Sequence, residues 1–505
     1  MLILLVDNIY TEIEGILPFN HLQEVEKLLS FRPEGFLFSQ AYNKWIFDKN
    51  GKKVRRVWDG YKRQFWKNTT KTYFPTGLIS IVINYFKNNN LQYSVKDRRN
   101  KPNVSLSLCL SSDLKFRDYQ ENVINIACEK TRGIISAATG SGKTKMSAGI
   151  IQRLNVKPSL FLVNSIDLLE QTIDAFNESL LDSNGSPVKI GQIGGGTIDI
   201  QDINVCTVQT LIRALGEKYE KYDSDDQDDL TPIEQYASDI KELIHSAELV
   251  ICDEIQDWRN ETCQTISKSL KSAYYKYGVS ATAFRDQGDD LLIQACFGKK
   301  IAIVTATELI EHENKYLIRP DIKIVHIKGN KSKFKQWQSI YKDRVVDNDY
   351  YNGIVTNIAN SLIEAGKTTL VLSQQIEHGQ KLADNITGCQ YLSGKSPKQK
   401  RKQGILNLRN KDIKCISSST IFDQGIDVSC LDAVILAGQG KSKCRAMQRV
   451  GRITRPYTHA DGTKKDKAIA IDFRIYDKYL LDHSIEREKM YRTEPAYHIE
   501  HIEEL

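Results

Sequence analysis

The stretch from Gly133 to Ile151, GIISAATGSGKTKMSAGII, constrains the fold more than any other part of this 505-residue chain. Its apolar start predicts a buried strand, and the residues from Lys143 onwards have the spacing of a helix. Between them, Gly140 and Gly142 let backbone N–H groups approach phosphate oxygens, because they carry no Cβ. Strand, glycine-rich turn and helix in this order predict a phosphate-binding loop.

Side chains in and beside the turn supply the remaining chemistry. Lys143 is predicted to bring its charge to the β- and γ-phosphates, and Thr144 to offer its hydroxyl to Mg²⁺. Thr139 and Ser141 are assigned to the same site, and ATP with Mg²⁺ is the expected ligand. Ala137 replaces the first glycine of the GxxxxGK[ST] pattern but leaves these chemical groups in place. A glycine-rich surface turn is the alternative.

Residues 250–258, VICDEIQDW, end an apolar run in two adjacent carboxylates. Asp253 stands where an enzyme with such a loop needs a carboxylate to hold Mg²⁺. Glu254 is predicted to orient and deprotonate the water that attacks the γ-phosphate. Gln256 cannot exchange a proton near neutral pH, but its amide donates and accepts hydrogen bonds, so we assign it to sensing or bridging. A solvated acid pair capping a strand is the alternative.

Short apolar runs alternate with helical segments from Asp113 onwards. Strands without polar alternation, separated by helices, indicate parallel sheets covered on both faces. One series of runs is GIISAAT, LFLVNS, INVCTV and LVICDE; after a pause around LIRPDI, a second is TTLVLS, KCISSS, DAVILAG and AIAIDF. We therefore expect an α/β protein with two tandem parallel-sheet domains and a small N-terminal α+β domain. The predicted boundaries are 1–112, 113–315, 316–475 and, for a helical C-terminal tail, 476–505.

The net charge of +7 is modest, but its distribution is informative. Between Lys44 and Lys71, ten Lys or Arg residues stand against two Asp, and three of the five tryptophans lie there. Basic side chains can follow phosphates and aromatic rings can stack on bases, so this stretch is predicted to bind nucleic acid. In the alternative, the rings form the domain core and the basic groups face solvent. The candidate residues are Lys52, Lys53, Arg55, Arg56, Trp58, Lys62 and Arg63.

Other features exclude classes of protein. No run approaches the roughly 20 apolar residues of a membrane span, and MLILLV at the start is too short for a signal core. The ten cysteines are scattered without a CxxC pair, which predicts reduced, buried thiols. The acidic segment 217–235 is predicted to be a mobile surface insertion. We expect a cytoplasmic protein without a membrane partner.

Motifs between residues 113 and 475 resemble, in order, those of the superfamily 2 helicases and translocases. In FRDYQ, the resemblance implies that Gln120 reads the adenine edge and that Arg117 supports the site. LVNSIDLLEQ, IGGG and CTVQTL lie where the family contacts nucleic acid, the last through Thr207 and Gln209.

Two further motifs carry the same resemblance, and a third matches it only in part. SATAFR is similar to the coupling motif, with Ser280 and Thr282 as its hydroxyls. STIFDQGIDVSCLDAVI resembles the motif that bridges ATP and nucleic acid, through Gly425 and Asp427. DEIQ departs from the family pattern, because Gln256 stands where His or Asp is usual.

QRVGRITRP matches the family pattern QxxGRxxR through Gln448, Gly451, Arg452 and Arg455. Arginine side chains suit the neutralisation of charge that grows on the γ-phosphate, because the guanidinium binds two oxygens at once. The family fold implies two RecA-like domains that hydrolyse ATP at their interface, with Gln448 among the nucleotide contacts.

Segments near both ends resemble the UvsW-type bacteriophage helicases: SFRPEGFLFSQAYNKWIF, WDG and FPTGLISIVINYF in the N-terminal domain, and YLLDHSIEREKMYRTE near the C-terminus. The resemblance implies remodelling of branched DNA: Holliday-junction migration, fork regression, and unwinding of R-loops and D-loops in recombination, repair and replication. The implied partners are branched or partly single-stranded DNA and RNA–DNA hybrids, in the host cytoplasm if a phage encodes the protein.

Three other functions stay open at this point. A double-stranded DNA translocase that does not separate strands would carry the same catalytic motifs. The motifs alone also permit an RNA helicase. A non-catalytic nucleic-acid binder with a vestigial phosphate loop is disfavoured by the intact Lys143, Asp253, Glu254, Arg452 and Arg455.

Overall fold

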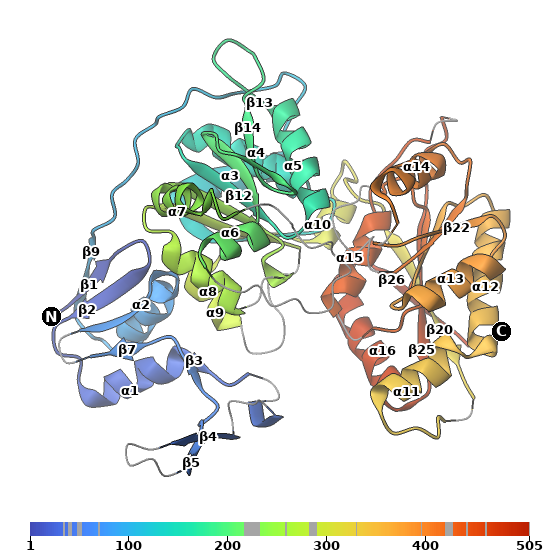
Figure 1. The fold of residues 1–505 in the computed structure, drawn as a ribbon, viewed down its shortest axis with the longest axis horizontal. Coiled ribbons are helices and arrows are strands. Elements are labelled where there is room, and N and C mark those ends of the chain that lie inside the picture. The colour runs from blue at the N-terminus through green and yellow to red at the C-terminus, as the bar shows by residue number, and fades with distance from the viewer. Residues whose placement is uncertain are drawn as a thin grey trace. The chain divides into compact units, whose positions relative to one another are not determined.

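The computed structural model divides into two compact units (Figure 1). The first unit runs from Met1 to Ile303 and the second from Val304 to Leu505, except that the turn Ala137–Gly142 groups with the second. The structure describes all residues except 34–35, 39–42, 48–52, 69–70, 217–232, 258–259, 282–289, 330, 395, 420–427, 441–442, 460–461 and 504–505. Most of the acidic segment 217–235 therefore lies outside the described residues.

The first unit begins with a five-stranded sheet in the order β7-β8-β2-β1-β9, in which only β1 and β9 pair in parallel. Its core joins Leu4 and Phe74 of the sheet to Val82 and Phe86 of α2. Two small antiparallel pairs, β3 with β6 and β4 with β5, accompany this sheet. The elements are β1 (Leu2–Val6), β2 (Tyr10–Glu14), α1 (Phe19–Leu28), β3 (Ser30–Phe31), β4 (Asn43–Phe47), β5 (Lys53–Val57), β6 (Lys62–Arg63), β7 (Trp66–Lys67), β8 (Thr72–Pro75), α2 (Ile79–Asn88) and β9 (Tyr93–Asp97).

An eight-stranded sheet in the order β15-β14-β16-β12-β17-β18-β11-β19 forms the rest of the first unit. Strands β12, β16, β17 and β18 are buried at every residue, which explains why their sequences show no polar alternation. The strands are β11 (Arg132–Ala137), β12 (Ser159–Val163), β14 (Ile190–Gly194), β15 (Thr197–Asp199), β16 (Ile203–Thr207), β17 (Leu249–Asp253), β18 (Tyr275–Ser280) and β19 (Lys300–Val304). The helices are α3 (Asp118–Lys130), α4 (Lys143–Leu154), α5 (Ile166–Ser179), α6 (Val208–Ala214), α7 (Ala237–Ser246), α8 (Asn260–Ser269) and α9 (Asp290–Phe297).

The second unit contains a seven-stranded parallel sheet in the order β22-β23-β21-β24-β25-β20-β26. Its strands are β20 (Pro320–Ile327), β21 (Thr369–Leu372), β22 (Cys389–Leu392), β23 (Cys415–Ser418), β24 (Ala433–Ile435), β25 (Ala468–Ile475) and β26 (His498–Ile502). Its helices are α10 (Ala306–Glu311), α11 (Trp337–Tyr341), α12 (Asp349–Glu364), α13 (Ile376–Asn385), α14 (Lys398–Arg409), α15 (Lys443–Ile453) and α16 (Lys478–Tyr491). The predicted α/β class with two parallel-sheet domains is confirmed, and the exact domain boundaries stay predictions.

Two expectations about the second domain are corrected. LIRPDI does not interrupt the strands, because β20 begins at Pro320, where the missing N–H is tolerated at a strand's first residue. The tail is helical only over α16, and His498–Ile502 then pairs with β20 as a parallel edge strand. Its five residues are only half-buried or exposed, so they lack the apolar run that marks the inner strands.

The predicted burial of the cysteines holds for five of the eight whose side chains are described, whereas Cys109 is exposed and Cys128 and Cys389 are half-buried. Cys109 belongs to the two-residue strand β10 (Cys109–Leu110), which pairs with β13 (Leu180–Leu181). Within the part of the chain that the structure describes, no helix is long and apolar enough to cross a bilayer.

A buried histidine in the second unit predicts acid sensitivity. His378 is fully buried in α13, its Nε2 lies 2.8 Å from Asn352 Oδ1, and burial lowers its pKa to about 4. The unfolded chain accepts a proton near pH 6.5 that the folded chain resists, so folding loses stability as the pH falls below that value. Between pH 7.5 and pH 5 we expect this group to cost about 2 kcal/mol.

Urea unfolding of the protein and of His378→Gln at both pH values measures this contribution. The variant keeps a neutral amide beside Asn352 and does not titrate, so its loss of stability between the two values should be smaller by that amount. Equal losses in both proteins would show that His378 is not the titrating group.

Candidate active site

The phosphate turn has the backbone that the sequence requires. Gly140 and Gly142 lie at φ +86° and +84°, a left-handed conformation that side chains with a Cβ rarely adopt. Helix α4 begins directly after them at Lys143, so its N-terminal N–H groups and the positive end of its dipole lie beside the turn. Ser141 is buried within the turn and Thr144 lies in the first turn of the helix. These residues fit a bound polyphosphate.

Two glycines allow close packing within the second unit, to which the turn belongs. A Cβ on Gly140 would lie 3.2 Å from Arg455 Cγ, and a Cβ on Gly451 would lie 2.6 Å from Thr139 Cβ. Arg452 and Gly451 lie in α15, and Arg455 follows that helix by two residues. The fold therefore brings the QxxGRxxR segment to the turn residues Thr139 and Gly140.

The acid pair lies at the carboxyl end of β17. Asp253 is the last residue of the strand and is buried. Glu254 follows at φ +47°, which costs a residue with a side chain about 1–3 kcal/mol, and its N–H donates to Asp253 Oδ1 at 2.9 Å. Its Oε1 lies 3.8 Å from Lys143 Nζ, so the carboxylate faces the predicted phosphate-binding lysine. The hydroxyl of Thr144 and the carboxylate of Asp253 are oxygen groups of the kind that Mg²⁺ prefers, and their role as its ligands stays a prediction.

Gln256 forms the bridge that its sequence position predicts. Its Nε2 donates to Glu254 Oε2 at 2.6 Å, and its Oε1 accepts a hydrogen bond from the Ser280 hydroxyl. Gln256, three residues after β17, and Ser280, the last residue of the neighbouring strand β18, are both buried. An aspartate at position 256 would be unable to donate to Glu254, whereas an amide donates and accepts at once. A coupling role for this bridge stays a prediction.

Asn164 lies in the motif LVNSIDLLEQ, but the sequence analysis did not single it out as a functional candidate. The side-chain Nδ2 of Asn164 donates to the backbone carbonyl of Glu254 at 3.4 Å. The backbone carbonyl of Asn164 accepts from Gln209 Nε2 at 2.7 Å. It stands directly after β12, the strand that pairs with β17 on the side away from β18. The sequence signal for Asn164 was a polar residue directly after an apolar strand. Such residues come together in the fold, because the carboxyl ends of parallel strands lie at one edge of the sheet.

Thr207 requires a correction. The residue is buried, and its hydroxyl accepts from the Thr210 N–H at the start of α6 and lies 2.7 Å from the Thr210 hydroxyl. It therefore caps a helix and does not present its hydroxyl to a nucleic acid. Gln209, the second residue of that helix, is half-buried and contacts Asn164.

The predicted adenine-reading residues lie at the start of α3. Gln120 is buried, and its Oε1 accepts from the Arg117 N–H at 3.0 Å. Its Nε2 and Arg117 Nη1 both approach the Tyr119 hydroxyl, at 3.4 and 3.2 Å. Their contact with adenine stays a prediction.

The basic and aromatic candidates of the N-terminal domain differ in their pairing and burial. Arg63 is paired with Glu26 and Asp59, so its charge is already compensated, contrary to the expectation of a phosphate contact. Trp58 is half-buried, and its Nε1 donates to the Tyr61 carbonyl at 3.0 Å, which agrees with a packing role. Lys62 is half-buried in β6. Lys52 lies outside the described residues, as do the side chains of Lys53, Arg55 and Arg56 in β5.

In the second unit, Gln448 and Arg452 lie in α15, where Gln448 is buried and Arg452 half-buried. Gly425 and Asp427, like Thr282 in the first unit, lie outside the described residues.

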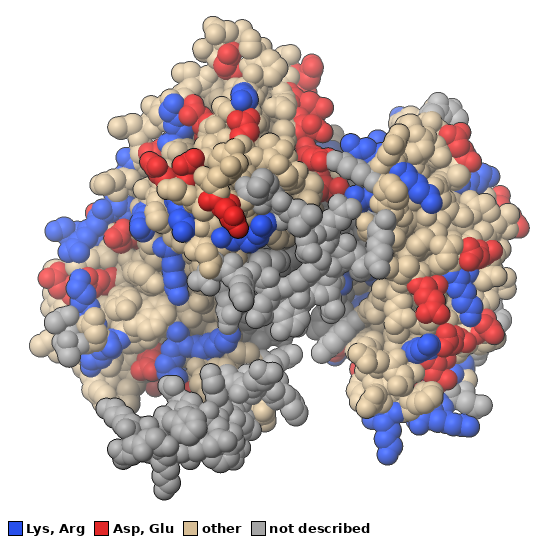
Figure 2. Space-filling model, in the orientation of Figure 1, with Lys and Arg blue, Asp and Glu red and all other residues tan. Residues whose placement is uncertain are grey.

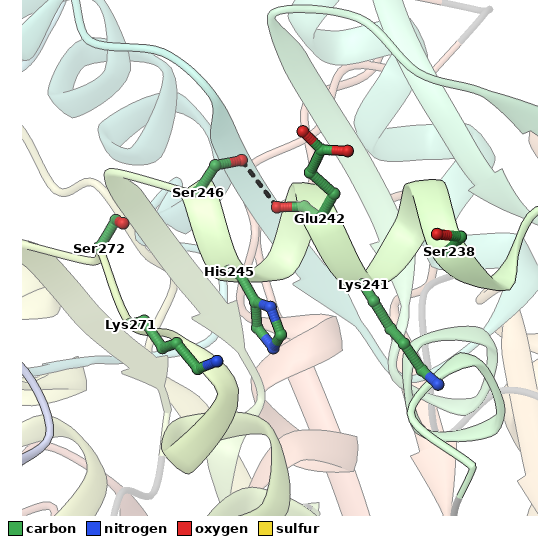
Figure 3. A pocket seen from close by; sticks show the side chains of 7 residues that line it. All are labelled: Ser238, Lys241, Glu242, His245, Ser246, Lys271 and Ser272. Carbon is green, nitrogen blue, oxygen red and sulfur yellow. Dashed lines mark hydrogen bonds between the residues drawn. The ribbon is translucent and has the colours of Figure 1, made fainter.

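A surface pocket of about 540 Å³ lies on the first unit, away from these groups. Figure 3 shows Lys241 and His245 projecting from α7, and Lys271 from the turn before β18. None of the predicted site residues lines it. Among the described residues there is also no cluster of three His, Cys, Asp or Glu side chains that would hold a metal.

Two family descriptions match the chain. The type III restriction enzyme, res subunit family matches residues 113–285, and the helicase conserved C-terminal domain matches residues 350–456. Together they cover more than half of the chain. The first match falls on the domain with the eight-stranded sheet and the second on the domain with the seven-stranded sheet. The chain belongs to the superfamily 2 helicases. This family consists of ATP-dependent enzymes that act on nucleic acid.

Two of the following three relatives of this helicase carry names that indicate DNA. This chain is 26% identical to helicase 22 of Sulfolobus islandicus filamentous virus over 68% of its own length and 62% of that protein. It is 25% identical to DNA 3'-5' translocase XPB2 of Sulfurisphaera tokodaii over 75% of this chain and 85% of that protein. It is 23% identical to ATP-dependent DNA helicase uvsW of Enterobacteria phage T4 over 74% of this chain and 75% of that protein.

A solved structure agrees on the fold. A fragment of an HsdR subunit of a type I restriction enzyme from Vibrio vulnificus matches with a TM-score of 0.53 and 17% identity. The match covers 77% of this helicase and 68% of that chain. At this identity the likeness concerns the fold alone.

Removal of the Gln256 bridge should reduce turnover more than nucleotide binding. Gln256→Glu is nearly isosteric, but it loses the donor to Glu254 and places a second negative charge beside it. We expect the kcat for ATP to fall at least about tenfold, since one lost hydrogen bond to a charged group costs about 1.5–3 kcal/mol, while KM changes little. Steady-state kinetics of this variant and of Gln256→His, which retains one donor, test this; unchanged kcat in Gln256→Glu would contradict it.

Asn164→Ala removes the donor to the Glu254 carbonyl. A hydrogen bond of this kind contributes about 1 kcal/mol, so we expect about a fivefold fall in nucleic-acid-stimulated kcat with unchanged affinity for ATP. Asn184→Ala, at an exposed turn of the same unit, is the matched control. If both variants lose the same activity, Asn164 does not position Glu254.

Proposed function

We propose that this helicase is an ATP-driven DNA motor that remodels branched DNA by junction migration, fork regression, and unwinding of R-loops and D-loops. The observation that supports ATP hydrolysis most directly is the placement of Glu254, which faces Lys143 on one side and contacts Gln256 on the other. A base, a phosphate-binding cation and a sensor are thereby linked within one domain.

In this proposal the chain's own groups divide the work. Lys143 and the N–H groups of the turn Thr139–Gly142 bind the phosphates of ATP, and Glu254 takes a proton from the attacking water. Thr144 and Asp253 would hold Mg²⁺, which when bound supplies positive charge to phosphate oxygens. Arg452 and Arg455 compensate the charge that grows on the γ-phosphate.

The remaining nucleotide contacts are proposed from the family pattern. We assign Arg117 and Gln120 to the adenine edge, and Gly425, Asp427 and Gln448 to the ATP side of the second domain. Ser280 and Thr282 are proposed to couple ATP to nucleic acid, together with Gln209. The basic stretch Lys52, Lys53, Arg55 and Arg56, with Lys62, is proposed to follow phosphates.

The choice of branched DNA rests on similarity. The relatives include a protein named a DNA 3'-5' translocase and one named an ATP-dependent DNA helicase, the phage uvsW protein. The segments SFRPEGFLFSQAYNKWIF and YLLDHSIEREKMYRTE, which resemble the UvsW type, lie outside the two matched family regions and so add support of their own.

A translocase that moves on duplex DNA without separating strands is the second candidate. It is favoured by the match of residues 113–285 to a restriction-enzyme subunit family and by the translocase named among the relatives. Its catalytic groups would be the same, so substrate preference has to distinguish the two.

Steady-state ATPase assays with Mg²⁺ provide the test. The protein is measured alone and with single-stranded DNA, duplex DNA, a four-way junction, an R-loop and single-stranded RNA. Stimulation by the junction and the R-loop beyond that by plain duplex is expected. Equal stimulation by duplex favours the translocase, and stimulation by RNA alone favours an RNA helicase.

Two variants test the assignment of the ATP site. Lys143→Ala should lower ATP hydrolysis at least about a hundredfold, because it removes the main phosphate-binding charge. Glu254→Gln should retain ATP binding, measured with a fluorescent ATP analogue, and hydrolyse slowly. Near-normal turnover in the first variant, or lost binding in the second, would contradict these roles.

A further inference from the structure

The segment Lys328–Gln336, between β20 and α11, carries charge that the structure does not compensate. Its sequence together with α11 and the following residue reads KGNKSKFKQWQSIYK, with five lysines and no acidic residue. Lys331, Lys333 and Lys335 are exposed, and within the described part of the chain no carboxylate pairs with any of them. The neighbouring Lys328 differs, because it pairs with Glu503 at 2.8 Å.

An exposed aromatic side chain lies among these lysines. Phe334 is 54% exposed, although apolar burial would favour placing the ring inside the domain. Figure 2 shows basic side chains at the end of the second unit where α11 lies (compare Figure 1). Cations on both sides of an exposed ring match the chemistry of a nucleic-acid strand, whose phosphates and bases alternate along its length.

The segment is anchored at Ser332 and next to its last residue, at Trp337. The Ser332 N–H donates to Asp477 Oδ2 at 2.6 Å, and this buried carboxylate also lies 3.3 Å from Arg344 Nε. The Phe334 N–H donates to the Ser332 hydroxyl at 3.3 Å. On the other side, Trp337 packs against His483, with ring centroids 4.6 Å apart. A backbone fixed in this way loses little conformational entropy when the segment binds a ligand.

We propose that Lys331, Lys333, Phe334 and Lys335 form a docking surface for a single nucleic-acid strand on the second domain. The lysines bind phosphates and Phe334 stacks on a base. This surface lies outside the helicase motifs of the second domain, and it rests on the proposed action on nucleic acid. It gives a motor on branched DNA a contact for a displaced strand in addition to the contacts of its catalytic motifs.

Binding of a fluorescent oligo(dT) to the full chain, by anisotropy over a series of salt concentrations, tests the charges. The triple variant Lys331→Gln/Lys333→Gln/Lys335→Gln should bind more weakly and should lower the slope of log K against log salt by about 2, at about 0.7 per lost phosphate contact. The matched control replaces Lys414, Lys464 and Lys467 with Gln. These exposed lysines precede β23 and β25 and so lie at the amino ends of the strands, whereas the proposed docking surface follows the carboxyl end of β20. The control should keep the slope of the unmodified protein.

Phe334→Ala tests the ring separately. It should weaken binding at least about fivefold, the lower end of what stacking of one base contributes, without changing the salt slope. Phe334→Trp should restore the affinity. A parallel series with oligo(U) distinguishes a DNA strand from an RNA strand, and thermal unfolding confirms that each variant is folded.

The outcomes separate this inference from the proposed function. If the unmodified protein binds and the triple variant keeps its affinity and slope, the docking surface is refuted while the motor function stands; the lysines then serve another partner, such as an acidic protein. An equal loss in the triple variant and the control also refutes it, because the effect is then one of net charge. If the unmodified protein binds no nucleic acid, the proposed function itself fails.

Discussion

Contacts to both the backbone and the carboxylate hold Glu254 in place, and the other residues of the candidate site lie around it. Its backbone has a left-handed conformation that is unfavourable for glutamate, and the contacts of the folded chain offset this cost. Asp253 accepts from its N–H and Asn164 donates to its carbonyl, while Lys143 and Gln256 contact its two carboxylate oxygens. The carboxylate therefore points in one direction, as a general base must if it is to act on a water molecule held between protein and phosphate.

This arrangement follows from the parallel sheet. β12, β17 and β18 are neighbours, so Asn164, Glu254 and Ser280 come together at one edge although more than a hundred residues separate the first from the last. β11, on the far side of β18, leads into the phosphate turn at the same edge. Polar side chains that are isolated in the sequence thereby become one hydrogen-bonded path from Gln209 to Ser280.

Basic residues of this chain differ in whether the fold compensates their charge. Arg63 lies in the stretch with the highest density of positive charge, yet Glu26 and Asp59 neutralise it. Lys331, Lys333 and Lys335 form a less conspicuous group in the sequence, and they remain exposed with no carboxylate beside them among the described residues. Charge density along a chain indicates where phosphates are attracted, but the pairing of side chains decides which charges are available.

The sequence by itself determined the α/β class, the phosphate turn, the acid pair and the place of Gln256, because each depends on local spacing: apolar runs, glycines before a helix, and polar residues just after a strand. Tertiary structure alone decided that Asn164 contacts Glu254 and that His498–Ile502 completes the second sheet. These depend on which strands become neighbours and on which face of an element is covered. Such contacts join residues far apart in the chain, so no local pattern records them.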